Sequence, residues 1–141
     1  MASLTFVRRI NLNAEKLCSI LVDYPVAPTP DIQVELITEG DQDAGGLGAT
    51  RFMTIGKDTI KQVLVEANLP QCYAYRIIDH PLLKDYYARI DLLEDDDATL
   101  VRYQAEFKPA IPFTGGIVLT KVKSNLVKLL DSIDTHYCQA E

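Results

Sequence analysis

Hydrophobic residues near the C-terminal end of the chain recur with the spacing of an amphipathic helix. Between Phe113 and Tyr137 they lie three or four residues apart, which places them on one stripe of an α-helix. Lysine, serine and aspartate residues occupy the opposite side, and only Ile117 and Val127 interrupt the pattern. A stripe this broad requires a broad apolar partner surface. The stripe consists of Val118, Leu119, Val122, Leu126, Leu129, Leu130, Ile133 and Tyr137.

Most of the chain before this helix alternates between apolar and polar residues, as β-strands do. Asn13 is a suitable N-cap for a short helix after the first strand, and Tyr24-Pro25 should end that helix. Turns containing glycine, proline or charged residues separate the strands. Consecutive hairpins indicate an antiparallel sheet whose one face is covered by the helices. The predicted strands are residues 4–12, 32–37, 48–55, 59–69, 72–79, 85–93 and 99–108.

Length and composition are those of an ordinary globular protein. The 141 residues predict a single domain over residues 1–141, with 48% hydrophobic and 24% charged residues. The net charge of −6 argues against a nucleic-acid partner, which would need clustered lysine and arginine. Neither a signal peptide nor a membrane span is evident, so we expect no integral membrane association. The three cysteines have no metal-ligand spacing and predict reduced thiols in a cytoplasmic protein.

No catalytic, cofactor or metal motif is found in the sequence. It lacks the nucleophile-elbow, zinc-protease and phosphate-loop patterns. His80 and His136 do not have the spacing of metal ligands, and we expect neither a cofactor nor a metal ion. His80 is a minor candidate for a general base, since an exposed loop histidine beside proline is the ordinary case.

Short motifs in the predicted strands carry a resemblance to a known superfamily. They are residues 48–52, 75–78, 81–82, 86–90 and 99–107, followed by the amphipathic helix. In these motifs and in element order the chain resembles the START-like, or SRPBCC, superfamily, whose small bacterial members are described as polyketide cyclase/dehydrase-like or lipid-transport-like. The resemblance implies an α+β helix-grip fold. In that fold a curved seven-stranded antiparallel sheet wraps around a long C-terminal helix, and a hydrophobic cavity lies between them.

The loop of residues 80–83 is similar in position to the loop that latches the ligand entrance in the plant hormone receptors of this superfamily. The opposing gate would be the connection of residues 56–58, which is only a short hairpin turn. This departure argues against a gate-and-latch mechanism.

Strand alternation assigns Tyr75, Tyr86 and Tyr103 to the concave face of the sheet. Each ring adds apolar area, and each hydroxyl needs a partner when buried, so the tyrosines either fill the core or contact a ligand. Arg51 falls on the same face, where a buried cation needs a carboxylate partner, an opening or an acidic ligand. The predicted cavity-lining residues are Arg51, Met53, Tyr75, Ile77, Tyr86, Ala88, Tyr103, Val122, Leu126, Leu129 and Ile133.

In the strand of residues 59–69, a one-residue bulge would exchange the two faces beyond it. Its residues on the outer face are predicted to be Gln62, Leu64 and Glu66. Its residues on the concave face are predicted to be Lys61, Val63, Val65 and Ala67.

Three functions are compatible with the sequence. The leading hypothesis is binding of a hydrophobic or amphipathic small molecule, such as a lipid, isoprenoid or polyketide, in the cavity. Less than roughly 300 Å³ of enclosed space would remove its basis. The resemblance also implies a polyketide cyclase or dehydratase that uses Arg51 and the inward tyrosines. The third is a protein-interaction module, including a homodimer, that uses an outer-face patch of Leu64, Ile78, Tyr87 and Leu93.

Overall fold

The computed structural model describes residues 2–23, 26–41 and 46–138, which form one seven-stranded sheet and two helices. All neighbouring strands are antiparallel, in the order β1-β7-β6-β5-β4-β3-β2. The sheet is a meander from β2 to β7, and the first strand completes it by pairing with the last. In chain order the elements are β1 (Ala2–Ile10), α1 (Ala14–Val22), β2 (Gln33–Thr38), β3 (Thr50–Ile55), β4 (Asp58–Asn68), β5 (Cys72–Ile78), β6 (Leu83–Asp95), β7 (Ala98–Pro109) and α2 (Gly115–Tyr137).

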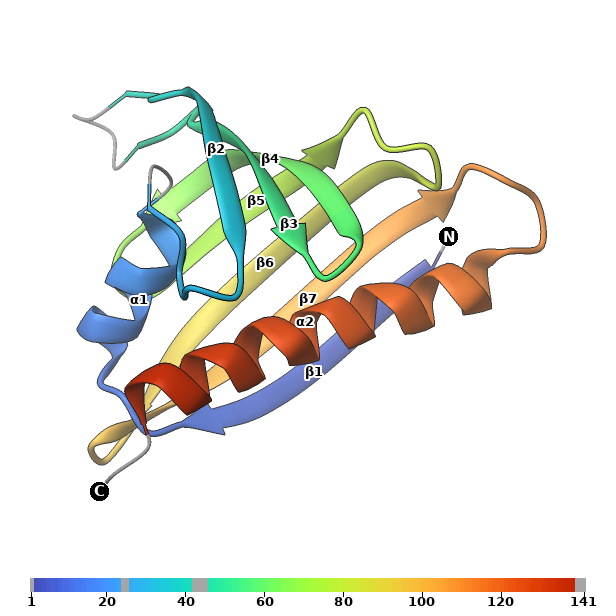
Figure 1. The fold of residues 1–141 in the computed structure, drawn as a ribbon. Helices are drawn as coiled ribbons and strands as arrows, with labels where there is room; N and C mark the ends of the chain where they lie inside the picture. The colour runs from blue at the N-terminus through green and yellow to red at the C-terminus, as the bar shows by residue number, and fades with distance from the viewer. Residues whose placement is uncertain (1, 24–25, 42–45, 139–141) are drawn as a thin grey trace.

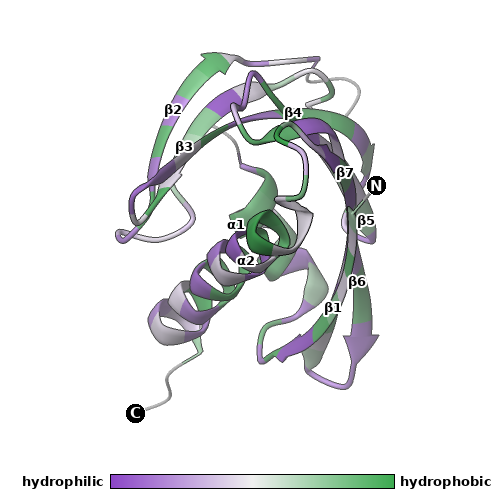
Figure 2. Cartoon of the chain, turned by 90° about the vertical axis from the view of Figure 1, so that its right-hand side faces the viewer, coloured by the Kyte–Doolittle hydropathy of each residue, from purple (hydrophilic) through white to green (hydrophobic). Residues whose placement is uncertain are grey.

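The long helix α2 lies along the concave face of the sheet. Figure 1 shows it crossing that face, with α1 at one end of the sheet. In the view of Figure 2 the sheet curves around α2, with β1 on one side of the helix and β2 and β3 on the other. The predicted α+β helix-grip fold, with a short helix after the first strand, is therefore confirmed.

Both helices begin close to the predicted positions. The side chain of Asn13 accepts a hydrogen bond of 2.7 Å from the backbone N–H of Lys16, as expected of an N-cap. The helix α2 begins at Gly115, within the stretch of residues 113–137 in which the helix was predicted. Phe113 precedes the helix, because its φ of 67° is incompatible with a right-handed helix. The predicted end of the first helix at Tyr24-Pro25 and residues 42–45 of a predicted loop lie outside the described residues.

The apolar stripe of α2 faces the sheet. Leu130 and Ile133 are at most 1% exposed, and Val118 and Leu126 are also buried. They pack against alternate residues of β5, β6 and β7, which are buried as their alternation predicts. The half-buried members of the stripe are Leu119, Val122 and Leu129.

The predicted faces of β4 are wrong over most of the strand. Gln62 and Leu64, which were assigned to the outer face, are 5% and 1% exposed. The register explains this, because Gln62 lies directly opposite the buried Arg51 and residues directly opposite each other share a face. A register shift between Leu64 and Glu66 then restores the predicted alternation, so that Ala67 lies opposite the buried Tyr73. The predicted inward residues Lys61 and Val63 lie on the other face, opposite the exposed Phe52 and Arg76, and Val65 falls within the register shift.

Polar contacts hold the C-terminal half of α2 in place. The hydroxyl of Ser132 donates a hydrogen bond of 3.0 Å to the carboxylate of Asp31, and Nε2 of His136 lies 2.9 Å from the same oxygen. On the other side of the helix, the guanidinium of Arg8 on β1 forms an ion pair with Asp131. These contacts join α2 both to the segment before β2 and to the edge strand β1.

A different contact holds the N-terminal half of α2 to the hairpin between β3 and β4. The Asp58 carboxylate accepts hydrogen bonds of 3.0 Å from Nδ2 of Asn125 and 3.0 Å from Nζ of Lys121. Although burial acts to raise the pKa of Asp58, these hydrogen bonds and the charges of nearby lysines lower it overall. The Asp58 and Lys121 side chains are 24% and 52% exposed, and ion pairs with such access to water contribute little stability.

The burial of α2 predicts a large difference between two substitutions of the same kind. Ile133→Ala should lower the free energy of unfolding by about 2–5 kcal/mol, because it opens a cavity at a side chain that is 0% exposed. Ile117→Ala removes the same atoms where the side chain is 76% exposed, and it should change stability by less than about 0.5 kcal/mol. Urea unfolding of both variants measures the difference, and equal losses would contradict the placement of the helix.

Candidate functional site

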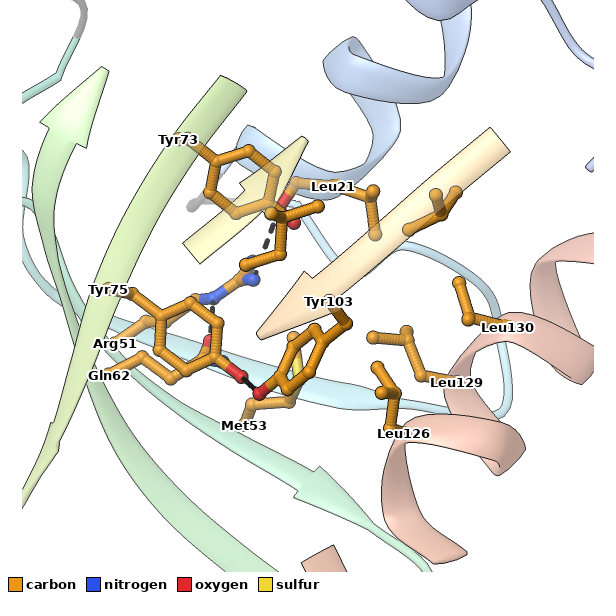
Figure 3. Close-up of a pocket in the computed structure, with 12 residues that line it drawn as sticks. Leu21, Arg51, Met53, Gln62, Tyr73, Tyr75, Tyr103, Leu126, Leu129 and Leu130 are labelled. Carbon is orange, nitrogen blue, oxygen red and sulfur yellow. Dashed lines mark hydrogen bonds between the residues drawn. The ribbon is translucent and has the colours of Figure 1, made fainter. Parts of the chain in front are cut away.

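Two small cavities lie side by side between the sheet and α2. Their volumes are about 30 and 50 Å³. The first extends toward Leu21 of α1, and the second toward Ile55 and Ile60 of the β3–β4 hairpin. Figure 3 shows residues around the first cavity. Six residues line both cavities: Met53, Gln62, Tyr75, Tyr103, Leu126 and Leu129.

The enclosed space is too small for a whole ligand. Cavities of 30 and 50 Å³ hold a few water-sized groups. Pockets for small molecules usually measure roughly 300–1,000 Å³. The expectation of a large preformed cavity is therefore wrong for this conformation, because the inward tyrosines and the leucines of α2 fill most of the space.

Arg51 on β3 is 3% exposed and lines the first cavity. Its Nε donates a hydrogen bond of 2.9 Å to Oε1 of Gln62, and its Nη2 donates one of 3.3 Å to the backbone carbonyl of Leu21 (Figure 3). The Leu21 carbonyl belongs to the last turn of α1, where carbonyl groups have no partner within the helix. Both acceptors are neutral oxygen atoms that draw the guanidinium toward β4 and α1.

Three tyrosine hydroxyls meet beside the arginine. Tyr75, Tyr86 and Tyr103 come from the neighbouring strands β5, β6 and β7, and their alternation directs all three rings inward. The hydroxyl of Tyr103 forms hydrogen bonds with the hydroxyls of both Tyr75 and Tyr86. The ring centroids of Tyr75 lie 6.0 Å from Tyr86 and 6.4 Å from Tyr103. We refer to these three residues as the tyrosine cluster.

Burial raises the pKa of every member of the tyrosine cluster, and it raises those of Tyr86 and Tyr103 well above the ordinary value. For Tyr75, hydrogen bonds from Tyr103 and Tyr86, the positive charge of Arg51 and a hydrogen bond from Gln62 act in the opposite direction without cancelling the rise. All three hydroxyls are therefore neutral near pH 7, and each has one proton to donate.

Most residues that the sequence assigns to the cavity line one or both of the two cavities. Ala88 and Ile133 are the exceptions, since they are fully buried but do not border either space. Gln62 was missed because the faces of β4 were exchanged, and Leu21 because alternation within a strand says nothing about a helix that packs against it. The other lining residues missed were Ile55, Ile60, Tyr73, Ile90, Val101, Asn125 and Leu130.

His80 borders neither cavity in the described part of the chain. Its Nδ1 accepts a hydrogen bond of 3.0 Å from the backbone N–H of Leu82, which ties the imidazole to its own loop. Burial lowers the pKa of His80, although the carboxylate of Asp58 acts to raise it. The local hydrogen bond occupies the nitrogen that a general base would use.

The predicted outer-face patch loses one of its four members. Leu64 is 1% exposed and faces the interior, so its assignment to a protein-interaction surface is wrong. Ile78 and Tyr87 are half-buried, and the Tyr87 hydroxyl donates to Glu66. Leu93 is 41% exposed. The homodimer stays a prediction.

Over residues 2–23, 26–41 and 46–138, no helix combines the length and the apolar character that a membrane crossing requires. In the same residues, no group of three or more histidine, cysteine, aspartate or glutamate side chains is placed to hold a metal ion.

Comparisons with known proteins agree with this architecture. The sequence model of a family described as "Polyketide cyclase / dehydrase and lipid transport" matches residues 1–137. A START superfamily protein from Mycobacterium smegmatis has a similar structure, with a TM-score of 0.76 and 13% identity over 96% of each chain. The protein XoxI from Bacillus cereus has a TM-score of 0.73 and 20% identity over 99% of this chain and 97% of its own.

Norcoclaurine synthase from Thalictrum flavum, solved in complex with dopamine and hydroxybenzaldehyde, is also similar. Its TM-score is 0.72 and its identity 13%, over 99% of this chain and 88% of its own. At this level of identity the likeness concerns the fold. No curated protein sequence matches the chain.

The tyrosine cluster predicts a specific loss of stability at high pH. Folding raises the pKa of these tyrosines, so their neutral forms stabilise the folded state fully at pH values below the pKa of an unfolded tyrosine, about 10. This stabilisation is lost as the pH rises toward the raised pKa values of the folded state. In this pH range each such tyrosine makes the free energy of unfolding fall more steeply, by up to about 1.4 kcal/mol per pH unit. Tyr103→Phe should therefore have a shallower decline than the wild type in urea unfolding at successive pH values above neutrality. Equal slopes would contradict the burial of this hydroxyl.

Proposed function

Because the chain belongs to the polyketide cyclase/dehydrase and lipid transport family, as its START-like resemblance predicted, we propose that it binds an amphipathic small molecule between the sheet and α2. A lipid, an isoprenoid and a polyketide are all of this kind. The single observation that carries the proposal is the polar group set at the cavities, formed by Arg51, Gln62 and the tyrosine cluster.

This polar group set is unusual for an interior that only stabilises a fold. A buried guanidinium and a buried amide cost free energy that leucine or valine side chains would not. Binding sites for small molecules combine apolar walls with a few converging polar groups. In this chain Met53, Leu126 and Leu129 supply apolar walls of both cavities. The polar side chains come from the consecutive strands β3 to β7 and point into the same space.

The two cavities fall below the roughly 300 Å³ that the sequence analysis required of a preformed site, so the proposal no longer rests on a preformed cavity. It rests on the polar group set, and binding requires the interior to expand. The contacts of α2 differ between its two sides. Toward β1 the backbone of α2 lies close to the strand over a longer stretch than it does to β3, and the pair of Arg8 and Asp131 lies on this side. Toward the β3–β4 hairpin the helix is held by Asp58 with Asn125 and Lys121, and Leu129 packs against an apolar cluster of β3 and β4. We therefore place the opening between α2 and the β3–β4 hairpin, above the second cavity.

A cyclase or dehydratase reaction is the second candidate, and Arg51 beside the tyrosine cluster is the observation in its favour. General acid–base catalysis is most efficient when the pKa of the catalytic group lies near the working pH. The raised pKa values of Tyr75, Tyr86 and Tyr103 move these groups away from neutrality. They are better suited to donate hydrogen bonds than to transfer protons, which favours binding over catalysis.

Native mass spectrometry of protein purified from its own host provides the first test. The expected spectrum contains, beside the mass of the chain, a species heavier by one non-covalently bound small molecule that is lost on collisional activation. Protein refolded from denaturant should lose this species and should bind the neutral fluorescent probe N-phenylnaphthylamine. Absence of both a co-purified molecule and probe binding would refute the proposal.

A variant that narrows the cavities locates the binding. Leu129→Phe adds a ring at a half-buried position that lines both cavities, and it should weaken probe binding by about tenfold or more, equivalent to roughly 1.4 kcal/mol. Leu93→Phe makes the same change at an exposed position on the far face and serves as the control. Equal probe affinity in the two variants would place the probe elsewhere on the protein.

A further inference from the structure

The polar side chains that line the second cavity are all electrically neutral. They are those of Gln62, Asn125 and the tyrosine cluster, and among the described residues no charged side chain borders this space. Arg51 borders only the first cavity. We infer that the second cavity takes the hydroxyl group of a neutral ligand, an alcohol or a phenol, which forms hydrogen bonds with the tyrosine cluster. This inference rests on the proposed binding function and adds the chemical class of the ligand.

The tyrosine cluster can accept a hydrogen bond from such a ligand. Each tyrosine hydroxyl has one proton and two lone pairs on its oxygen. Each hydrogen bond within the cluster uses one proton and one lone pair, and Gln62 donates one further hydrogen bond to Tyr75. Lone pairs therefore remain on the cluster however its protons are arranged.

A hydroxyl group matches this cluster better than a ligand group that only accepts hydrogen bonds. A ligand hydroxyl both donates and accepts, so it can join the cluster in whichever direction the tyrosine protons point. An ether oxygen only accepts, and it needs a tyrosine proton for which the hydrogen bonds to Tyr103 compete. The cluster therefore favours an alcohol over an ether of the same size.

Asn125 provides a second neutral acceptor at the same cavity. Its Nδ2 donates a hydrogen bond of 3.0 Å to the Asp58 carboxylate, so its amide oxygen remains to accept a hydrogen bond from a ligand. Asn125 is half-buried on α2, on the side of the helix that faces the β3–β4 hairpin. Both the tyrosine oxygens and this amide oxygen favour a ligand that has a proton to donate.

A charged ligand group is disfavoured in the second cavity. Burial raises the pKa of Tyr86 and Tyr103 well above the ordinary value, because a negative charge on an oxygen atom is costly there. A ligand carboxylate would bear the same cost. A ligand ammonium group would lose its hydration in a cavity whose described lining residues include no carboxylate.

The apolar lining gives the ligand a direction. Ile55, Ile60 and Val122 line the second cavity beside the β3–β4 hairpin, where we place the opening. The hydroxyl group would lie against the tyrosine cluster. The apolar body of the ligand would extend between these three side chains toward the opening.

Three competitors of equal carbon number test the inference by displacing N-phenylnaphthylamine from the refolded full-length protein. 1-Octanol has a hydroxyl group, its isomer 1-methoxyheptane has an ether oxygen instead, and octanoate is negatively charged at neutral pH. 1-Octanol should displace the probe at about fivefold lower concentration than 1-methoxyheptane, which corresponds to one hydrogen bond of roughly 1 kcal/mol. Octanoate should be a weaker competitor than 1-octanol.

Tyrosine substitutions assign the preference for 1-octanol over 1-methoxyheptane to the tyrosine cluster. The double variant Tyr86→Phe with Tyr103→Phe removes two of the three hydroxyls and should lower the preference to less than about twofold. Tyr87→Phe makes the same change on the outer face, where the hydroxyl donates to Glu66, and should keep the wild-type preference. Circular dichroism verifies that each variant is folded.

The outcomes separate the inference from the proposed function. If the probe does not bind the wild type, the binding function itself fails. If the probe binds, and 1-methoxyheptane or octanoate displaces it as readily as 1-octanol, the binding function stands and the neutral hydroxyl ligand is refuted. Failure of 1-octanol to displace the bound probe refutes it as well. A preference that the folded double variant retains, or that Tyr87→Phe loses to the same extent, would also refute it. The wild-type preference decides the question even if the double variant does not fold.

Discussion

The central constraint in this structure is a guanidinium group enclosed in an apolar interior. A buried charge is costly unless dipoles or opposite charges surround it. Arg51 connects three parts of the fold for this reason: its own strand β3, Gln62 on β4 and the last turn of α1. The antiparallel register sets Gln62 directly opposite Arg51, and the position of α1 at one end of the sheet brings the Leu21 carbonyl within reach. The same contacts that stabilise the charge define one end of the first cavity.

The tyrosine cluster extends this polar region across the sheet while keeping it neutral. Its rings fill most of the space under α2, which explains why the enclosed volumes are only about 30 and 50 Å³. A closed interior of this kind is compatible with binding only if one boundary is weak. The side of α2 toward the β3–β4 hairpin meets this condition better, because the helix backbone lies against β1 over a longer stretch than against β3.

The sequence predicts the fold well, because the periodicities of α2 and of the strands are long and regular. It also identifies Arg51 and the three tyrosines as inward-facing, since β3, β5 and β7 alternate regularly around them and β6 alternates from Tyr86 onward, beyond the irregularity at Lys84 and Asp85. The faces of β4 were predicted wrongly. The short turn at residues 56–58 was the signal for the correct faces, because it pairs Ile55 with Asp58 and thereby sets Arg51 opposite Gln62. The contact with Leu21 and the cavity volumes depend on how separate elements pack, which the alternation within one strand does not determine.

The most direct test of a ligand site under α2 uses the methionine methyl groups. The chain contains two methionines, Met1 and Met53, and Met53 is 2% exposed and lines both cavities. In protein with isotope-labelled methionine methyl groups, the Met53 signal should shift during titration with N-phenylnaphthylamine, and the shift should saturate together with the probe fluorescence. The Met1 signal is the internal reference. Saturating fluorescence without any change in the Met53 signal would contradict the account.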